Sequence, residues 1–209
     1  MFLPTLFLLM LAPEPAGVPP EQALERLVQG NQRFVQHKEK HPDQAPAYRK
    51  QLASEQHPFA VVLGCADSRV APELLFDQGL GDLFVVRDAG NTIDDEMLGS
   101  IEYAVEHLGS RLIVVMGHEK CGAVSAAVAG GEAQGHIKSV VAAIQPSVDE
   151  TKSQPGDKVH NCVVANARRV AKQIRASEPV LKEMVEKGQI KVIAANYDLD
   201  SGKVEFFKE

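Results

Sequence analysis

Three residues have side chains that together could hold a metal ion. Cys65 directly follows the apolar run 59–64, and His118 and Cys121 come just after the apolar run 112–116. Ligands collect at the carboxyl ends of parallel strands, so we expect the three side chains to meet at one rim of a sheet. His118 and Cys121 are three residues apart where a helix is expected to begin, which would place them about 5–6 Å apart on one helix face.

Two thiolates and one imidazole suit Zn²⁺, which is tetrahedral and accepts sulfur and nitrogen ligands. Three protein ligands leave a fourth position for water, and this open position distinguishes a catalytic zinc site from a structural one. A His-x-x-Cys pair alone is a weak signal, but here it is joined to Cys-x-Asp-x-Arg at the end of another predicted strand. The sequence predicts one zinc ion per chain, bound by Cys65, His118 and Cys121.

Asp67 and Arg69 follow the first predicted ligand at two-residue steps. Zinc lowers the pKa of a bound water to about 7, but two thiolates donate more charge than three imidazoles and should weaken this effect. Asp67 could help by accepting the hydrogen bond of the zinc-bound hydroxide, and Arg69 could keep Asp67 ionised in a bidentate pair. Asp67 could also rotate away from Arg69 and become a fourth zinc ligand, which would close the site.

The surrounding pattern alternates strands and helices. Apolar runs at 59–64, 83–86, 112–116 and 190–195 are typical of strands buried on both faces. Helical periodicity covers 94–108 and an N-terminal helical arm at 21–36, which we expect to pack across a neighbouring protomer. The pattern predicts an α/β fold: about four parallel strands plus an antiparallel edge strand at 204–207, flanked by helices. Residues 146–157 are predicted to form a loop.

Length and composition narrow the class of protein. The chain has 209 residues, of which 44% are apolar and 24% charged, so we expect one zinc-binding domain at 20–209. A net charge of −6 makes a nucleic-acid groove built on a general positive field improbable. Three cysteines are too few for a disulfide scaffold. The expected partners are a small-molecule substrate and copies of the same chain.

Residues 1–19 form an apolar, Pro-rich N-terminal segment. The apolar run 2–12 is too short to span a bilayer, so no stable membrane span is expected. It has the character of a shortened export signal, or of an arm that packs on the domain or on a neighbouring subunit. A cytoplasmic location and export to the periplasm both stay open.

Four separated motifs resemble the signatures of the β-class carbonic anhydrases, in the order and spacing of that family. They are CADSRV at 65–70, FVVRDAGN at 84–91, IEYAV at 101–105 and GHEKCGAV at 117–124. The resemblance covers roughly residues 20 to 207. It implies a zinc-dependent, reversible hydration of CO2 to bicarbonate and a proton, a parallel α/β fold, and a homodimer or an assembly of dimers.

The resemblance also implies which residues contact the substrate. Gln56 matches a glutamine that helps to hold bicarbonate, and Phe84 and Tyr103 match apolar residues of the CO2 pocket. Ala89 stands where the family has a valine in that pocket. Gly122 follows the last ligand, and its backbone N–H can approach the substrate without side-chain interference.

Two positions bear on the subtype and on departures from the family pattern. Members that close their site at low pH usually carry a tryptophan where this chain has Val62, and the chain contains no tryptophan. It therefore resembles the open, plant-like subtype. Asp88 stands where the family usually has asparagine, and it could form an ion pair with its neighbour Arg87.

Other interpretations remain open. One is a non-catalytic zinc-binding structural or sensor domain with Asp67 as a permanent fourth ligand, but intact substrate-pocket residues argue against it. Another is a CS2 or COS hydrolase on the same fold, which the site residues do not exclude. Cys162 lies in a helical stretch and is predicted to be a buried apolar residue rather than a ligand. The other histidines are predicted to lie on the surface.

Overall fold

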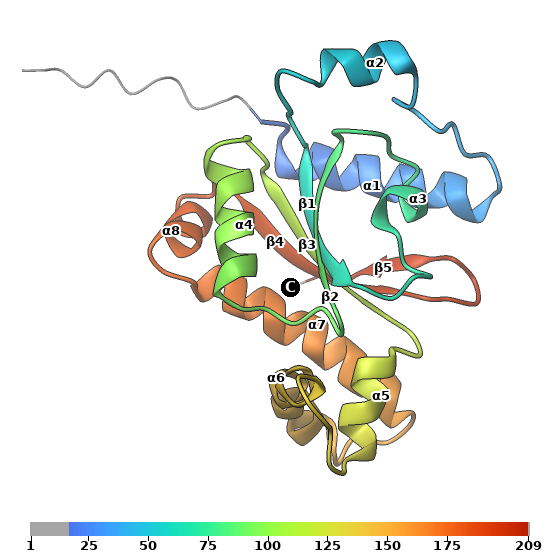
Figure 1. Cartoon of the computed structure of the whole chain (residues 1–209), viewed down its shortest axis with the longest axis vertical. Helices are drawn as coiled ribbons and strands as arrows, with labels where there is room; N and C mark the ends of the chain where they lie inside the picture. The colour runs from blue at the N-terminus through green and yellow to red at the C-terminus, as the bar shows by residue number, and fades with distance from the viewer. Residues whose placement is uncertain (1–16, 209) are drawn as a thin grey trace, which may run out of the picture.

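The computed structural model describes residues 17–208. Within that range the chain forms one sheet with the strand order β2-β1-β3-β4-β5 (Figure 1). The strands are β1 (Ala60–Cys65), β2 (Leu83–Asp88), β3 (Leu112–His118), β4 (Lys191–Tyr197) and β5 (Val204–Phe206). The first four pair in parallel and β5 is antiparallel to β4. The predicted α/β architecture is confirmed.

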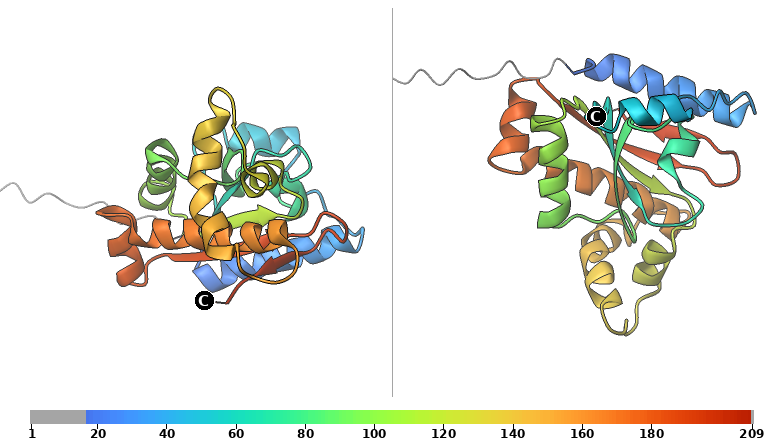
Figure 2. Two further views of the ribbon diagram at one scale, coloured as in Figure 1. Left: turned by 90° about the horizontal axis from the view of Figure 1, so that it is seen from below. Right: turned by 45° about the horizontal axis from the view of Figure 1, so that its top comes forward.

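Helices cover both faces of the sheet, which explains why every residue of β1 and β3 is buried (Figure 2). Val61 and Leu63 point to the face covered by α4 (Asp95–Glu106), α7 (Lys158–Ala176) and α8 (Val180–Glu186). Val62 and its neighbours on the other face pack against α1 (Pro20–Val35) and α3 (Pro72–Leu75). The short helix α2 (Pro46–Gln51) lies in the stretch before β1.

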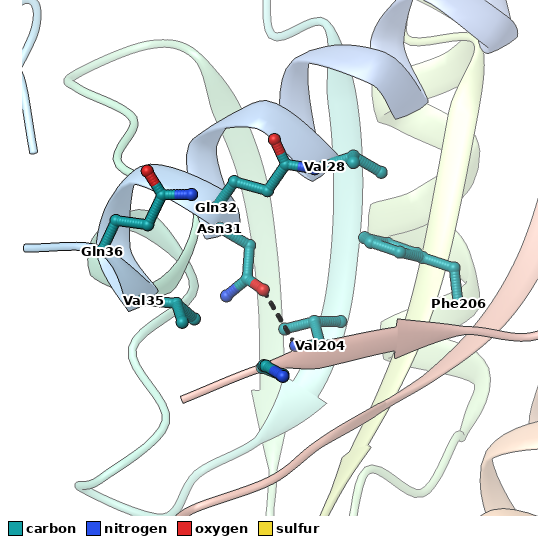
Figure 3. A pocket seen from close by; sticks show the side chains of 8 residues that line it. Val28, Asn31, Gln32, Val35, Gln36, Val204 and Phe206 are labelled. Atoms are coloured by element: carbon teal, nitrogen blue, oxygen red, sulfur yellow. Dashed lines mark hydrogen bonds between the residues drawn. The ribbon is translucent and has the colours of Figure 1, made fainter. Parts of the chain in front are cut away.

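The helix α1 is tied to the sheet edge through Asn31, a buried residue. Its side-chain amide donates to the carbonyls of Leu75 and Gly202, and its oxygen accepts the N–H of Val204 in β5. A cavity of about 290 Å³ lies beside this contact, between α1 and β5 (Figure 3). Apolar and polar side chains both line it, and none of the predicted site residues does. Contact of α1 with a neighbouring protomer stays a prediction.

The predicted loop at 146–157 is wrong for its first half. Helix α6 (Ile137–Thr151) continues through Pro146, and α5 (Gly122–Ala129) and α6 together project below the sheet in Figure 1. A proline inside a helix removes one backbone hydrogen bond. Here Ile144, Ser147 and Thr151 are buried on one helix face, and the Thr151 hydroxyl donates to the Ser147 carbonyl. Burial of that face outweighs the lost bond.

Within residues 17–208, no helix combines the length and apolar character needed to cross a membrane. The apolar run 2–12, for which we considered an export signal, lies outside the described residues.

Candidate metal centre

The three predicted ligands meet at the carboxyl end of the sheet. Cys65 is the last residue of β1 and His118 the last of β3, and these two strands are neighbours. Cys121 is the N-cap residue of α5. The ligand atoms of the three residues all lie within 4.8 Å of one another, and the two sulfurs are 4.0 Å apart. All three residues are buried, so the predicted convergence is confirmed.

The reason we expected His118 and Cys121 to be close is wrong, although their proximity is real. They do not share a helix face, because His118 ends a strand and α5 begins only at Gly122. Lys120 between them has a positive φ of 55°, in the left-handed region, which makes a tight turn. That turn brings Cys121 back over the end of β3.

His118 is oriented as a ligand. Its Nδ1 lies 2.9 Å from the carbonyl oxygen of Glu119, which can only accept, so the proton belongs on Nδ1. The other ring nitrogen, Nε2, is buried, has a free lone pair and has no hydrogen-bond partner. Leaving a buried polar atom unpaired is costly, and a metal ion would satisfy it. Together with two nearby sulfurs, this nitrogen fits zinc.

A hydrogen bond joins the two sulfurs. The pKa of Cys65 is lowered to about 4, first by the hydrogen bond with the Cys121 sulfur and further by His118 and backbone N–H groups, against the effect of burial. The pKa of Cys121 is raised by the same bond and by burial. Because these two sites are coupled, the pair readily loses one proton and holds the other. A divalent cation would favour loss of both and bind two thiolates.

Asp67 and Arg69 form the predicted pair beside these ligands. Arg69 donates from Nε to Oδ1 over 2.9 Å and from Nη2 to Oδ2 over 2.7 Å. These bonds come first among the influences that hold the pKa of Asp67 well below its usual range. Asp67 Oδ2 is also 3.9 Å from the unpaired Nε2 of His118. An ionised carboxylate thus lies next to the three donor atoms.

Arg87 holds the loop between Cys65 and Asp67, a role that sequence reasoning missed. It donates to the carbonyls of both residues, over 2.9 and 2.7 Å. The expected Arg87–Asp88 ion pair is wrong, because the Asp88 carboxylate instead accepts from the N–H and the hydroxyl of Thr92. Arg87 bonds to backbone carbonyls, which every residue has, so residue types and spacing in the sequence gave no signal.

Two of the predicted substrate residues lie at the same end of the sheet. Gly122 is exposed directly after Cys121, and a Cβ built there would meet nothing within 4 Å. Open space therefore lies on the side of its Cα where a side chain would be. Ala89 is exposed in the loop that follows β2, next to Gly90, whose N–H donates to the Cys65 sulfur over 3.2 Å.

The other substrate residues do not join the ligands within one chain. Gln56 precedes the amino end of β1, whereas Cys65 is at its carboxyl end. Phe84 pairs with Val61 near that amino end and packs in the core. Gln56 and Tyr103 line a cavity of about 670 Å³, and none of the three ligands lines it.

The remaining cysteine and histidines behave as predicted. Cys162 is fully buried in α7 among apolar residues and is not part of the ligand group. The other histidines are exposed: His37, His41, His57, His107, His136 and His160.

Comparison with known proteins agrees with this geometry. A family model described as "Carbonic anhydrase" matches residues 60–204. Carbonic anhydrase 2 of Mycobacterium tuberculosis is 42% identical over 188 residues, covering 88% of this chain and 91% of that protein. The carbonic anhydrase of Pseudomonas aeruginosa is 32% identical over 175 residues, covering 75% of this chain and 76% of that protein.

Solved structures show the same likeness. The β-carbonic anhydrase CcaA has a TM-score of 0.71 at 26% identity, covering 88% of this chain and 95% of that one. The Coccomyxa β-carbonic anhydrase in complex with acetazolamide has a TM-score of 0.70 at 25% identity, covering 89% and 86%. With the ligand geometry, the family match and these relatives taken together, this chain belongs to the β-carbonic anhydrase family.

Proposed function

We propose that this chain hydrates CO2 reversibly to bicarbonate and a proton at a zinc ion bound by Cys65, His118 and Cys121. One observation carries the proposal. Two sulfurs and an unpaired imidazole nitrogen lie within 4.8 Å of one another, next to an ionised carboxylate. A purely structural site would need a fourth ligand, but both Asp67 oxygens bond to Arg69 instead.

The chain's own residues would divide the work at this site. When bound, zinc supplies acidity, lowering the pKa of a coordinated water to about 7. Asp67 accepts a hydrogen bond from the attacking water and aims its lone pair at CO2, and Arg69 keeps Asp67 ionised and oriented. The N–H of Gly122, in the first turn of α5, can donate to a substrate oxygen, and no side chain at Gly122 would obstruct the approach.

Asp67 bonded to Arg69 also favours the open subtype, in which the carboxylate does not take the fourth position. Nothing in the described residues favours CS2 or COS over CO2 as the substrate.

Stopped-flow measurement of CO2 hydration tests the proposed activity. Zinc-loaded protein should hydrate CO2 between about pH 7 and 9, near the pKa of a zinc-coordinated water. Protein stripped by a chelator should be inactive, and added zinc should restore it. One zinc per chain with undetectable turnover in this range would refute the proposal.

We infer further that the active form is a homo-oligomer in which a second copy supplies Gln56 and Tyr103. These residues lie at the opposite end of the sheet from the ligands of their own chain. Tyr103 is 49% exposed and Leu80, on the same cavity wall, is 48% exposed. Large exposed apolar side chains gathered at one place are typical of an interaction surface.

Mixed oligomers test this arrangement. Gln56→Ala and Cys65→Ala should each be strongly impaired alone. When the two variants are unfolded and refolded together, activity should return. An oligomer that contains one copy of each variant has a site in which the ligand set of one chain and Gln56 of the other chain are both intact. Activity no higher than the sum of the separate variants would contradict a shared site, as would a fully active monomer in sedimentation.

A further inference from the structure

The peptide of Gly90 links the Cys65 sulfur to the interior of the helical layer. Its N–H donates to Cys65 Sγ over 3.2 Å, and its carbonyl accepts the side-chain amide of Asn166 in α7 over 2.9 Å. Gly90 has a φ of +83°, and a Cβ there would lie 2.7 Å from Cδ1 of Ile144. Only glycine fits this position. The two hydrogen bonds hold its peptide between the sulfur and Asn166.

Asn166 has one available orientation. It is fully buried, and its Oδ1 accepts from the Ser147 hydroxyl and from Nη2 of Arg169, each over 3.2 Å. A guanidinium has no acceptor, so if the Asn166 amide were flipped, its NH2 group would face the N–H donors of Arg169. Arg169 Nε in turn donates to Ser147 Oγ over 2.9 Å. Hydrogen bonds therefore run in one direction from Arg169 through Ser147 and Asn166 to the Gly90 carbonyl.

We propose that Asn166 is a positioning residue of the metal centre, which holds the Gly90 N–H on the Cys65 sulfur. The proposal rests on the proposed zinc site. A hydrogen bond to a ligand sulfur draws charge away from it, which partly offsets the strong donation of two thiolates, and it also fixes the direction of the sulfur lone pairs. Asn166 does not contact the reacting atoms and acts only through the Gly90 peptide.

The decisive variant is Asn166→Asp. It keeps the shape and still accepts from Ser147 and Arg169, but it replaces the donor that faces the Gly90 carbonyl with a second acceptor. The Gly90 peptide should then leave the Cys65 sulfur. The matched control is Asn161→Asp, which makes the same change of charge on the same helix, where the amide donates only to the exposed Pro155 carbonyl.

Co(II)-loaded protein provides a readout that does not depend on turnover. In Asn166→Asp the thiolate-to-Co(II) charge-transfer absorption should move to lower energy, because a sulfur without its hydrogen bond gives up an electron more easily. Zinc affinity, measured by competition with a chelator, should fall about ten-fold or more. Asn161→Asp should match the wild type in both measurements.

The outcomes separate this proposal from the proposed function. If the wild type shows no thiolate charge-transfer absorption, the zinc site itself is wrong. If the wild type shows it and folded Asn166→Asp has the same spectrum and affinity, only the role of Asn166 is refuted. Asn166→Ala, which removes the donor without adding charge, should reproduce the spectral shift.

If neither variant folds, hydrogen exchange in the metal-loaded wild type decides. The Gly90 amide should exchange far more slowly than that of exposed Ala89, and equally fast exchange would overturn the proposal.

Discussion

The carboxylate of Asp67 offers the sharpest test of the mechanism, through Asp67→Asn. In the structure its Oδ1 accepts the Arg69 backbone N–H and Nε, each over 2.9 Å, and its Oδ2 accepts Nη2 over 2.7 Å. An asparagine has one oxygen, so its NH2 group must face either a guanidinium donor or the attacking water. The side chain would lose both its charge and its fixed orientation.

The size of the effect follows from the bond that is lost. A hydrogen bond to a charged group contributes about 1.5–3 kcal/mol, which is about a ten- to hundred-fold loss of kcat/KM. Zinc content should stay at one per chain, because Asp67 is paired with Arg69 and is not one of the three ligands. Thermal stability should change little, since the Arg69 side chain is half exposed and such ion pairs stabilise weakly.

Stopped-flow kinetics and metal analysis on the same protein sample measure these effects. The control is Asp157→Asn, which makes the same chemical change at the N-cap of α7, where asparagine caps equally well. Its activity should equal that of the wild type. An Asp67→Asn enzyme within two-fold of wild type would remove Asp67 from the mechanism. Loss of zinc would show instead that Asp67 supports the metal.

Three further substitutions test the fold around the site. Asp77 accepts from two backbone N–H groups and from Arg33; burial raises its pKa, but these bonds outweigh burial and lower the pKa overall. The stabilisation by the ionised Asp77 is therefore present above about pH 4 and is lost as pH falls through the native pKa. Asp77→Asn should lower the free energy of unfolding by about 2 kcal/mol at pH 7. Its stability should also depend less on pH in the acid range than that of the wild type. A variant whose stability falls more steeply with acid than that of the wild type would contradict a lowered pKa of Asp77. Asp94→Ala removes the N-cap of α4, which accepts the Met97 N–H, and should cost about 1 kcal/mol in urea unfolding; an unchanged midpoint would exclude the cap. Cys162→Ala should cost about 1 kcal/mol and leave zinc content unchanged, whereas lost zinc would make Cys162 a ligand.

The strands and the ligand set could be predicted from the sequence because both depend on local patterns. Continuous apolar runs mark strands buried on both faces; Cys65 directly follows one run, and His118 comes two residues after another. Neighbouring parallel strands end at one edge, so the convergence follows from topology. The exact turn at Lys120 does not follow, because a left-handed lysine has no sequence signal of its own.

The missed parts depend on contacts between distant residues or on competing local rules. The proline and polar residues of 146–151 indicated a loop, yet Ile144, Ser147 and Thr151 recur at helical spacing and are buried together. Asn166 and Gly90 are 76 residues apart, so no local pattern connects them. For Gln56 the family resemblance supplied a role, and the structure places it before the amino end of β1, far from the ligands of its own chain.

X-ray absorption at the zinc edge of the loaded wild type tests the metal centre most directly. Cys65, His118 and Cys121 predict two sulfur ligands with nitrogen and oxygen completing a four-coordinate shell, where the oxygen is solvent. A shell without sulfur, or one with four protein ligands and no place for solvent, would contradict the account.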